Sequence, residues 1–303
     1  MKSYWFLLAG SAALVMNPSG QGAIDQQIRT QVRSEPNMIA GPPRSSGSAA
    51  ANNQGVLIET SSNLGLGIGA ELLGDYAEAI KLLTRAVEEE RADAFKLALA
   101  HRFRGLAYKN SGRRTQALQD FLEVIRLQPQ LDLGYYDAGV IYNLQGRYKE
   151  ALEMMTRAIN LQKDTRGLAR RRSERGNAYF HLGDFKRAQA DFVAALRLDR
   201  RDPDVLNNVA WFRATCSDAR FRNGKEAVEL ATLACTLDKW KDPDEIDTLA
   251  AAHAEAGNFA EAERYQQKAL DLLSENEALR PKFRARFDQY RARQPVRQQV
   301  SGA

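Results

Sequence analysis

The stretch Asp132 to Thr165, DLGYYDAGVIYNLQGRYKEALEMMTRAINLQKDT, contains two short apolar patterns with the spacing of an α-helix. The first pattern, YDAGVIYNL, stops at Gln145-Gly146, and the second resumes at Tyr148 and continues through Ala151 and Ile159. Neither helix could bury its apolar stripe alone, because short helices depend on packing against a neighbour. The stretch therefore predicts a helix-turn-helix unit that needs further units beside it.

The rest of the chain supplies such units in the same register. Superposing the stretch on the sequence gives six units, at residues 60–93, 98–131, 132–165, 169–202, 203–241 and 243–276. The eighth position of every unit is glycine or alanine, and the twentieth is alanine once an insertion around Asp218 to Arg222 is allowed. Small residues at fixed positions let two helices approach closely. The turn between the helices favours glycine, and it holds Gly74, Gly112, Gly146, Gly183 and Gly257.

These units resemble the tetratricopeptide repeat, a helix-turn-helix unit of 34 residues. The best matches are GLAYKNSGRRTQALQDFLEVIRLQP (Gly105 to Pro129) and GNAYFHLGDFKRAQADFVAALRLD (Gly176 to Asp199), although the tryptophan that the family has at position 4 is absent from all units. The resemblance implies an all-α fold, a right-handed α-solenoid in which stacked units bury a common core.

The segments after the array complete this expectation. The side chains of Leu279, Phe283, Phe287 and Tyr290 share one helical face, which predicts that residues 277–294 form a capping helix over the last unit. Residues 295–303 carry no periodic pattern, and we expect a disordered tail there. Residues 24–59 contain prolines and the run RSSGSAAANNQG, which is typical of a disordered linker.

The first 23 residues have the pattern of an export signal. Lys2 precedes the apolar run YWFLLAGSAALVM, and small residues near Gly22-Ala23 offer a cleavage site. The run is shorter than the roughly 20 residues that span a bilayer, so a retained membrane anchor is the lesser alternative. No cysteine follows the run, which argues against lipid attachment there. We therefore expect an exported protein of the periplasm or cell envelope, of bacterial type.

Length and charge narrow the function classes. With 303 residues and 44% hydrophobic content, the chain can bury a large apolar surface. The net charge of +5, from 43 basic and 38 acidic residues, is far from that of a nucleic-acid-binding tail, and export argues further against nucleic acid as a partner. Membrane contact is expected only through the N-terminal segment.

The family resemblance also implies which side chains face a partner. In the family, positions 2, 5, 9, 12 and 13 of the first helix of each repeat line a groove for a bound peptide or protein. Asparagine and arginine can bond an extended backbone, and aromatic rings offer rigid contact faces. Carried over to this sequence, the groove residues are Arg102, Lys109, Tyr136, Asn143, Arg170, Ser173, Asn177, Asn207 and Trp211. The alternative is that each is an ordinary solvated residue.

Charge is uneven along the array. Residues 166–202 hold ten basic and five acidic side chains, with Arg170, Arg171, Arg172 and Arg175 close together. One interpretation is a site for anionic peptides, envelope polymers or a membrane surface; the other, which we favour, is a solvated helix face.

The sequence offers no convincing catalytic, metal or cofactor site. GLGIGA, residues 65–70, imitates a phosphate-binding loop, but the preceding residues make a poor strand and Gly67 is explained by the repeat. The histidines His101, His181 and His253 lie in three different units without metal-ligand spacing. Cys216 and Cys235 lie too far apart along their helices to form a bridge, and we expect both to be buried and free.

The resulting hypothesis is a non-catalytic scaffold that binds a protein or peptide in the groove. The alternative is an adaptor that presents substrates to an envelope protease or a peptidoglycan hydrolase, and a third possibility is a cryptic enzyme. The oligomeric state and the identity of the partner are open at this point.

Overall fold

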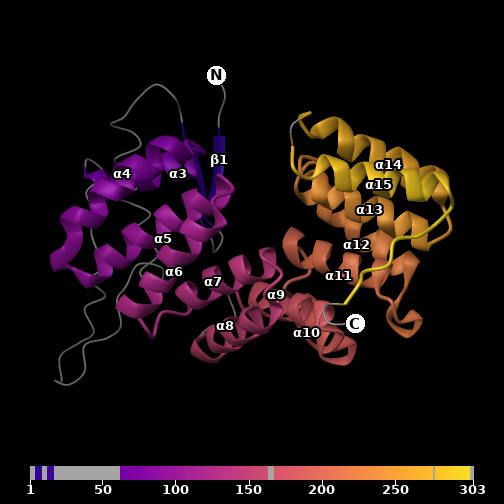
Figure 1. Cartoon of the computed structure of the whole chain (residues 1–303), viewed down its shortest axis with the longest axis horizontal. Helices are drawn as coiled ribbons and strands as arrows, with labels where there is room; N and C mark the ends of the chain where they lie inside the picture. The colour runs from indigo at the N-terminus through magenta and orange to yellow at the C-terminus, as the bar shows by residue number, and fades with distance from the viewer. Residues whose placement is uncertain (1–3, 9–11, 17–61, 163–166, 276, 301–303) are drawn as a thin grey trace. The chain divides into compact units, whose positions relative to one another are not determined.

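The computed structural model describes residues 4–8, 12–16, 62–162, 167–275 and 277–300 (Figure 1). From residue 62 onward these residues form helices joined by turns, which confirms the all-α fold. Within the N-terminal apolar run, strands β1 (Tyr4–Leu8) and β2 (Ala12–Met16) pair antiparallel, with Tyr4 opposite Met16. The predicted linker over residues 24–59 lies outside the described residues.

The helices follow one another in pairs along the chain. They are α3 (Asn63–Leu72), α4 (Tyr76–Glu89), α5 (Ala94–Asn110), α6 (Arg114–Leu127), α7 (Asp132–Leu144), α8 (Tyr148–Leu161), α9 (Leu168–His181), α10 (Phe185–Leu198), α11 (Pro203–Thr215), α12 (Gly224–Leu237), α13 (Pro243–Glu255), α14 (Phe259–Leu272) and α15 (Arg280–Arg291). Short 3-10 helices occupy Glu90–Ala92 and, in the insertion of the fifth unit, Ala219–Phe221. Each odd-numbered helix up to α13 is the first helix of a predicted unit.

One helix begins earlier than the register predicts. α5 starts at Ala94, ahead of the unit start at residue 98. The side chain of Asp93 caps it by accepting hydrogen bonds from the backbone N–H groups of Phe95 at 3.0 Å and Lys96 at 3.1 Å. These bonds satisfy donors that the first helical turn leaves free. The residues between the first two units therefore lengthen α5.

The small residues of the repeat occupy tight helix contacts. The alanines at the twentieth position of all six units are fully buried. A Cβ atom added to Gly105 would lie 2.6 Å from the Phe121 ring, so only glycine permits this approach. The predicted turn glycines have φ between 73° and 82°, the left-handed region in which glycine carries no steric penalty.

The chain divides into two compact units, residues 1–141 and 142–303. The core of the first unit contains Leu64, Leu83 and Phe103. In the second unit, Phe180, Phe192 and Phe212 form an aromatic cluster in which the Phe180 and Phe212 rings meet edge to face at 5.1 Å.

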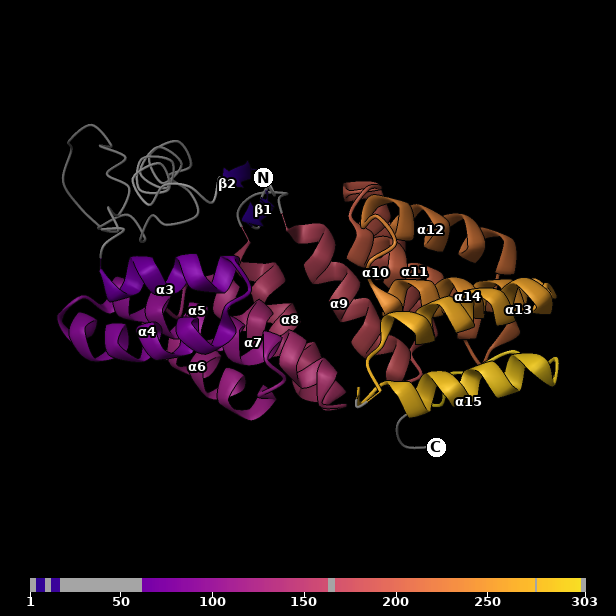
Figure 2. The same cartoon turned by 90° about the horizontal axis from the view of Figure 1, so that it is seen from above.

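The C-terminal segment belongs to the second unit. α15 packs beside α14 (Figure 2), and its side chains Phe283 and Tyr290 are fully buried. Where the sequence predicts a disordered tail, the structure instead places residues 295–300 along α11 and α13. The tail contributes Val296 to the core and supplies a donor to a free carbonyl at the end of α11.

Candidate protein-binding surface

The predicted groove residues all lie on first helices, but they fall in both compact units. Arg102, Lys109 and Tyr136 belong to the first unit, on α5 and α7. The second unit holds Asn143 at the end of α7, Arg170, Ser173 and Asn177 on α9, and Asn207 and Trp211 on α11. We describe the two sets separately.

In the first unit, two of the three residues interact with carboxylates of neighbouring helices. The Arg102 guanidinium donates from Nε to Asp137 of α7 at 2.7 Å, and both side chains are largely buried. Lys109 lies near Glu71 of α3; burial raises the pKa of Glu71, and the charge of Lys109 partly opposes that shift. Tyr136 is half-buried. Arg102 therefore ties α5 to α7, a role for which a bound partner is not required.

In the second unit, a line of polar side chains connects α7, α9 and α11. Asn143 donates from Nδ2 to the Glu174 carboxylate at 2.8 Å, and Asn208 donates to the Ser173 hydroxyl at 3.2 Å and to Glu174 at 3.4 Å. Asn143 and Ser173 are buried. We call Asn143, Ser173, Glu174 and Asn208 the polar ladder. Glu174 and Asn208 were not predicted as groove residues, although both are polar residues next to predicted positions.

Two asparagines beside the polar ladder keep hydrogen-bonding capacity. Asn177 is half-buried, and its side chain makes no hydrogen bond with any other described residue. The Oδ1 atoms of Asn207 and Asn143 are buried without a partner in the described part of the chain. An unpaired buried acceptor costs about 1–3 kcal/mol, so such groups favour the arrival of a donor.

Trp211 is covered by the C-terminal helix. The Arg286 guanidinium of α15 lies over the Trp211 ring, 4.4 Å from its centre, in the geometry of a cation–π contact. Arg286 also pairs with Asp247 of α13, which accepts a hydrogen bond from Gln266 of α14 at 2.9 Å. Burial lowers the pKa of Arg286. The sequence pattern of α15 predicted its cap but gave no sign of this contact with α11.

The arginines of α9 are engaged within the protein. Arg170 pairs with Asp202 at 2.5 Å, and Arg172 and Arg175 converge on Asp191 of α10 at 3.1 and 2.7 Å. The hydrogen bond from Arg175 to Asp191 raises the pKa of that guanidinium. The favoured interpretation was a solvated helix face; Arg172 and Arg175 instead form ion pairs with the buried Asp191.

The same arrangement occurs two units earlier in the chain, between α5 and α6. Asp120 of α6, at the position that corresponds to Asp191, bonds His101 Nδ1 at 2.8 Å and Arg104 at 2.7 Å. In both units one buried aspartate holds two side chains of the preceding helix. In these two units this position therefore joins the two helices of the repeat.

The remaining histidines and cysteines lie in packed surroundings. His181 stacks on Tyr148 with ring centres 4.3 Å apart, and His253 stacks on Tyr265. Cys216 and Cys235 are buried, and burial raises the pKa of the Cys235 thiol to about 12. In the described ranges, histidine, cysteine, aspartate and glutamate form no group of three or more that could hold a metal ion.

A shallow cavity of about 580 Å³ lies between α14 and α15, away from every predicted groove residue. Its lining includes Gln267, Leu270, Arg280 and Arg284. None of its lining residues is a predicted groove residue, and we assign it no ligand.

Paired helices in a fixed register, joined by glycine turns and packed through small residues, define a helical-repeat protein. Family models of the tetratricopeptide repeat match residues 104–165, 169–202 and 246–275. Together with the fold, these matches show that the chain contains tetratricopeptide repeats over these residues. The matches leave out the first and fifth helix pairs, so the total of six repeats stays a prediction.

Curated relatives carry the same repeat. Tetratricopeptide repeat protein 13 of Homo sapiens is 30% identical over 178 residues, which is 56% of this chain and 20% of that protein. Tetratricopeptide repeat protein 16 of Homo sapiens is 30% identical over 141 residues, 43% of this chain and 15% of the relative. The lipoprotein NlpI homolog of Haemophilus influenzae is 26% identical over 166 residues, 55% of this chain and 49% of the relative. The chain thus spans half or less of each relative.

Solved structures of similar fold support the architecture. The Cut9–Hcn1 hetero-tetramer of the APC/C matches with a TM-score of 0.61 at 15% identity, covering 76% of this chain and 42% of that one. A tetratricopeptide repeat protein from Parabacteroides merdae matches with a TM-score of 0.54 at 13% identity, covering 89% and 92%. At these identities the likeness concerns the fold alone.

Proposed function

We propose that this protein is a non-catalytic scaffold that binds a peptide or protein partner along the first helices of its repeats. The tetratricopeptide fold supports a role in protein interaction, since stacked rigid helices hold binding side chains in place without folding anew. The finer assignment, to the face that carries the polar ladder, Asn177 and Asn207, is our own.

The observation that carries this assignment is the unused hydrogen-bonding capacity of Asn177 and Asn207. An amide side chain donates and accepts at once, so it can pair with both the N–H and the C=O of an extended peptide. The Asn177 side chain makes no hydrogen bond within the described chain, and the Oδ1 of Asn207 has no partner there. The two residues lie on α9 and α11, the first helices of successive units.

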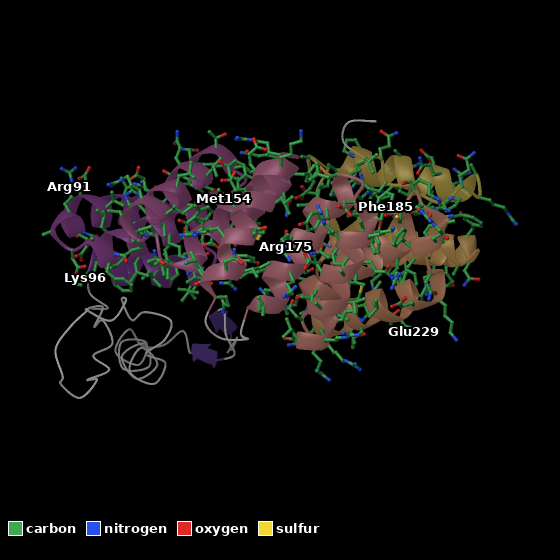
Figure 3. The ribbon with its side chains drawn as sticks, turned by 90° about the horizontal axis from the view of Figure 1, so that it is seen from below. Arg91, Lys96, Met154, Arg175, Phe185 and Glu229 are labelled. Carbon is green, nitrogen blue, oxygen red and sulfur yellow. The ribbon has the colours of Figure 1, made fainter. Side chains whose placement is uncertain are left out.

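Peptide selection tests the assignment. Peptides selected from a random display library on the purified protein should lose at least tenfold in affinity when Asn177 and Asn207 are both changed to alanine. Circular dichroism should show unaltered helicity, because neither amide supports a helix contact. The matched control is Lys186→Ala with Glu229→Ala, two exposed residues on the second helices α10 and α12; Glu229 is labelled in Figure 3. Equal affinity for the asparagine variant and this control would place the site elsewhere.

We also propose that the protein acts in the cell envelope of a bacterium. The apolar N-terminal run with its small-residue site supports export, and a lipoprotein homolog is among the relatives. In the described ranges, no helix combines the length and the apolar character required to cross a bilayer. The absence of catalytic activity and of nucleic-acid binding remain predictions.

A further inference from the structure

The last described residues cross the ends of three first helices in the second unit. After α15 the chain turns at Arg293, which has a φ of 55°, and residues 295–300 run back past α13 and α11 towards α10 (Figure 1). Side chains alternate along this segment: Val296, Gln298 and Val300 are half-buried, whereas Arg297 and Gln299 are exposed. This alternation is that of an extended peptide lying on a surface.

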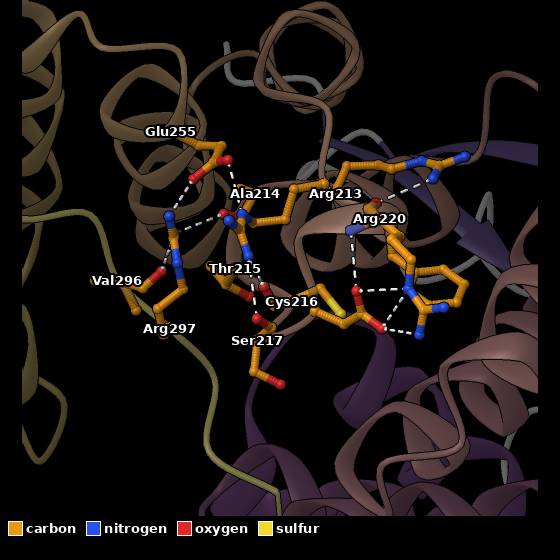
Figure 4. A network of polar contacts seen from close by, with 12 residues as sticks. Arg213, Ala214, Thr215, Cys216, Ser217, Arg220, Glu255, Val296 and Arg297 are labelled. Atoms are coloured by element: carbon orange, nitrogen blue, oxygen red, sulfur yellow. Dashed lines mark hydrogen bonds and ion pairs between the residues drawn. The ribbon is translucent and has the colours of Figure 1, made fainter.

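The segment is held by contacts of the kind that bind peptides. The backbone N–H of Gln298 donates to the carbonyl of Thr215 at 2.8 Å, one of the carbonyls that the end of α11 leaves free. The Arg297 guanidinium pairs with Glu255 of α13 at 2.7 Å and donates to the Ala214 carbonyl at 3.5 Å (Figure 4). Val296 packs in the cluster that contains Ala214.

The segment also passes close to the turn between α9 and α10. The Val300 side chain lies 3.5 Å from the point where a Cβ atom of Gly183 would stand, at the turn between α9 and α10. The receiving surface therefore offers an apolar contact, a carboxylate, free backbone carbonyls and the close approach of a glycine turn, in that order. We call this surface, formed by Ala214, Thr215, Glu255 and Gly183, the receiving strip.

We infer that the receiving strip is a peptide-binding site and that the chain's own C-terminal segment is its intramolecular ligand. The inference rests on the proposed function and narrows the partner to an extended peptide with the pattern valine, arginine, two polar residues and valine, as in Val296 to Val300. Such a peptide competes with the segment for the strip. The segment thereby limits access to the strip.

The contacts are weak enough for exchange. The segment is held by a backbone hydrogen bond, a long hydrogen bond to the Ala214 carbonyl, the packing of Val296, and an ion pair whose arginine is 35% exposed. Exposed ion pairs contribute little. Terminal segments with few buried contacts open most readily. The three helices that form the strip are, by contrast, joined through the packed core of the second unit.

A labelled peptide tests the inference in the full chain. The probe is fluorescein-labelled RARQPVRQQVSGA, the sequence of residues 291–303, and its affinity is measured by fluorescence anisotropy. The chain with Val296→Asp and Arg297→Glu, whose own segment binds weakly, should bind the probe at least tenfold more tightly than the wild-type chain. The matched control, Gln299→Glu, adds a negative charge to the same segment on its exposed side and should behave as wild type.

A second control changes the probe instead of the protein, so it does not depend on the folding of a variant. A probe with glutamate in place of the arginine that corresponds to Arg297 should bind the double variant at least tenfold more weakly. Hydrogen exchange at the Gln298 amide should be slow in the wild-type chain and fast in the double variant. Undetectable binding, equal affinity of the probe for wild type and variant, or equal affinity of both probes would overturn the inference.

Two further outcomes separate this inference from the proposed function. Suppose that the segment variant binds the probe more tightly, but the selected peptides keep their affinity for the variant with Asn177→Ala and Asn207→Ala. The receiving strip is then supported as a binding site, and the proposed face with the two asparagines is contradicted. If light scattering shows a dimer of the wild-type chain that the double variant abolishes, the segment binds a second copy, and the intramolecular assignment is overturned.

Discussion

At the scale of residues, the absence of a single methyl group decides how closely two helices approach. Both Gly67 and Gly69 lie on α3, yet only Gly67 faces α4. A Cβ at Gly67 would lie 2.6 Å from the Leu83 side chain and 3.2 Å from its backbone nitrogen, whereas a Cβ at Gly69 would meet nothing within 4 Å. The same helix therefore contains a required glycine and a dispensable one.

Replacing each of these two glycines by alanine should therefore have opposite effects on stability. Gly67→Ala should lower the free energy of unfolding by about 1–3 kcal/mol, because the helices must separate to admit the methyl group. Gly69→Ala should raise it by about 0.5–1 kcal/mol, because alanine is the better helix former. Urea unfolding of both variants measures the effects. A loss of stability at Gly69 or none at Gly67 would contradict the proposed register.

Residue patterns account for what the sequence could and could not predict. The buried alanines at the twentieth position and the glycine turns recur in every unit or nearly so, and recurrence makes them visible in one sequence. The partner of Arg102 could not be read in this way, since an arginine can reach several carboxylates and only the packing selects Asp137. The same holds for Arg175 and Asp191.

At the scale of elements, α8, α9 and α15 contribute to the surroundings of one histidine. His181 of α9 stacks on Tyr148 of α8, and Lys282 of α15 is close enough to affect its charge. Burial first, and then the positive charge of Lys282, lower the pKa of His181 to about 4 from 6.5. The folded protein therefore keeps this ring neutral under mildly acidic conditions.

The consequence is a pH-dependent stability with a defined window. Above pH 6.5 the ring is neutral in both folded and unfolded chains, so His181 has no effect. Between pH 6.5 and 4 the unfolded chain binds a proton that the folded chain excludes, and the free energy of unfolding falls by about 2 kcal/mol, a value reduced because the ring is partly exposed. Thermal unfolding should show this decrease.

The control for this window is His181→Phe, which keeps an aromatic ring on Tyr148 and removes the titration. Its melting temperature should fall less between pH 6.5 and 4 than that of the wild-type chain. His253, whose pKa burial also lowers, remains in both proteins and contributes equally. Parallel curves for the two proteins would refute the role of His181.

The sequence predicted the presence and the buried face of α15, but not all of its contacts. Its apolar face predicted a cap, and Phe283 and Tyr290 are indeed fully buried. The contact of Arg286 with Trp211 was missed because it joins a helix outside the repeat pattern to a residue far away in sequence. For the same reason, residues 295–300 looked like a tail: they have no helical period, and their partners are backbone carbonyls and one carboxylate.

At the scale of the whole molecule, the N-terminal apolar run is the basis for the proposed location of the protein in the cell envelope. If the export signal acts as proposed, the mature protein isolated from its host should lack the first 23 residues. N-terminal sequencing of protein from the envelope fraction measures this directly. An intact Met1 in envelope protein would indicate a retained anchor, and recovery from the cytoplasm would contradict export.

The course of the last residues also sets an order of events during synthesis. The chain leaves the ribosome from its N-terminus, and domains generally fold as they emerge. The helices α11 and α13 precede Val296, Arg297 and Gln298 in the chain and therefore emerge before them. During that interval the strip at Thr215 and Glu255 is open, so a nascent chain can meet a partner that the finished protein admits only by competition.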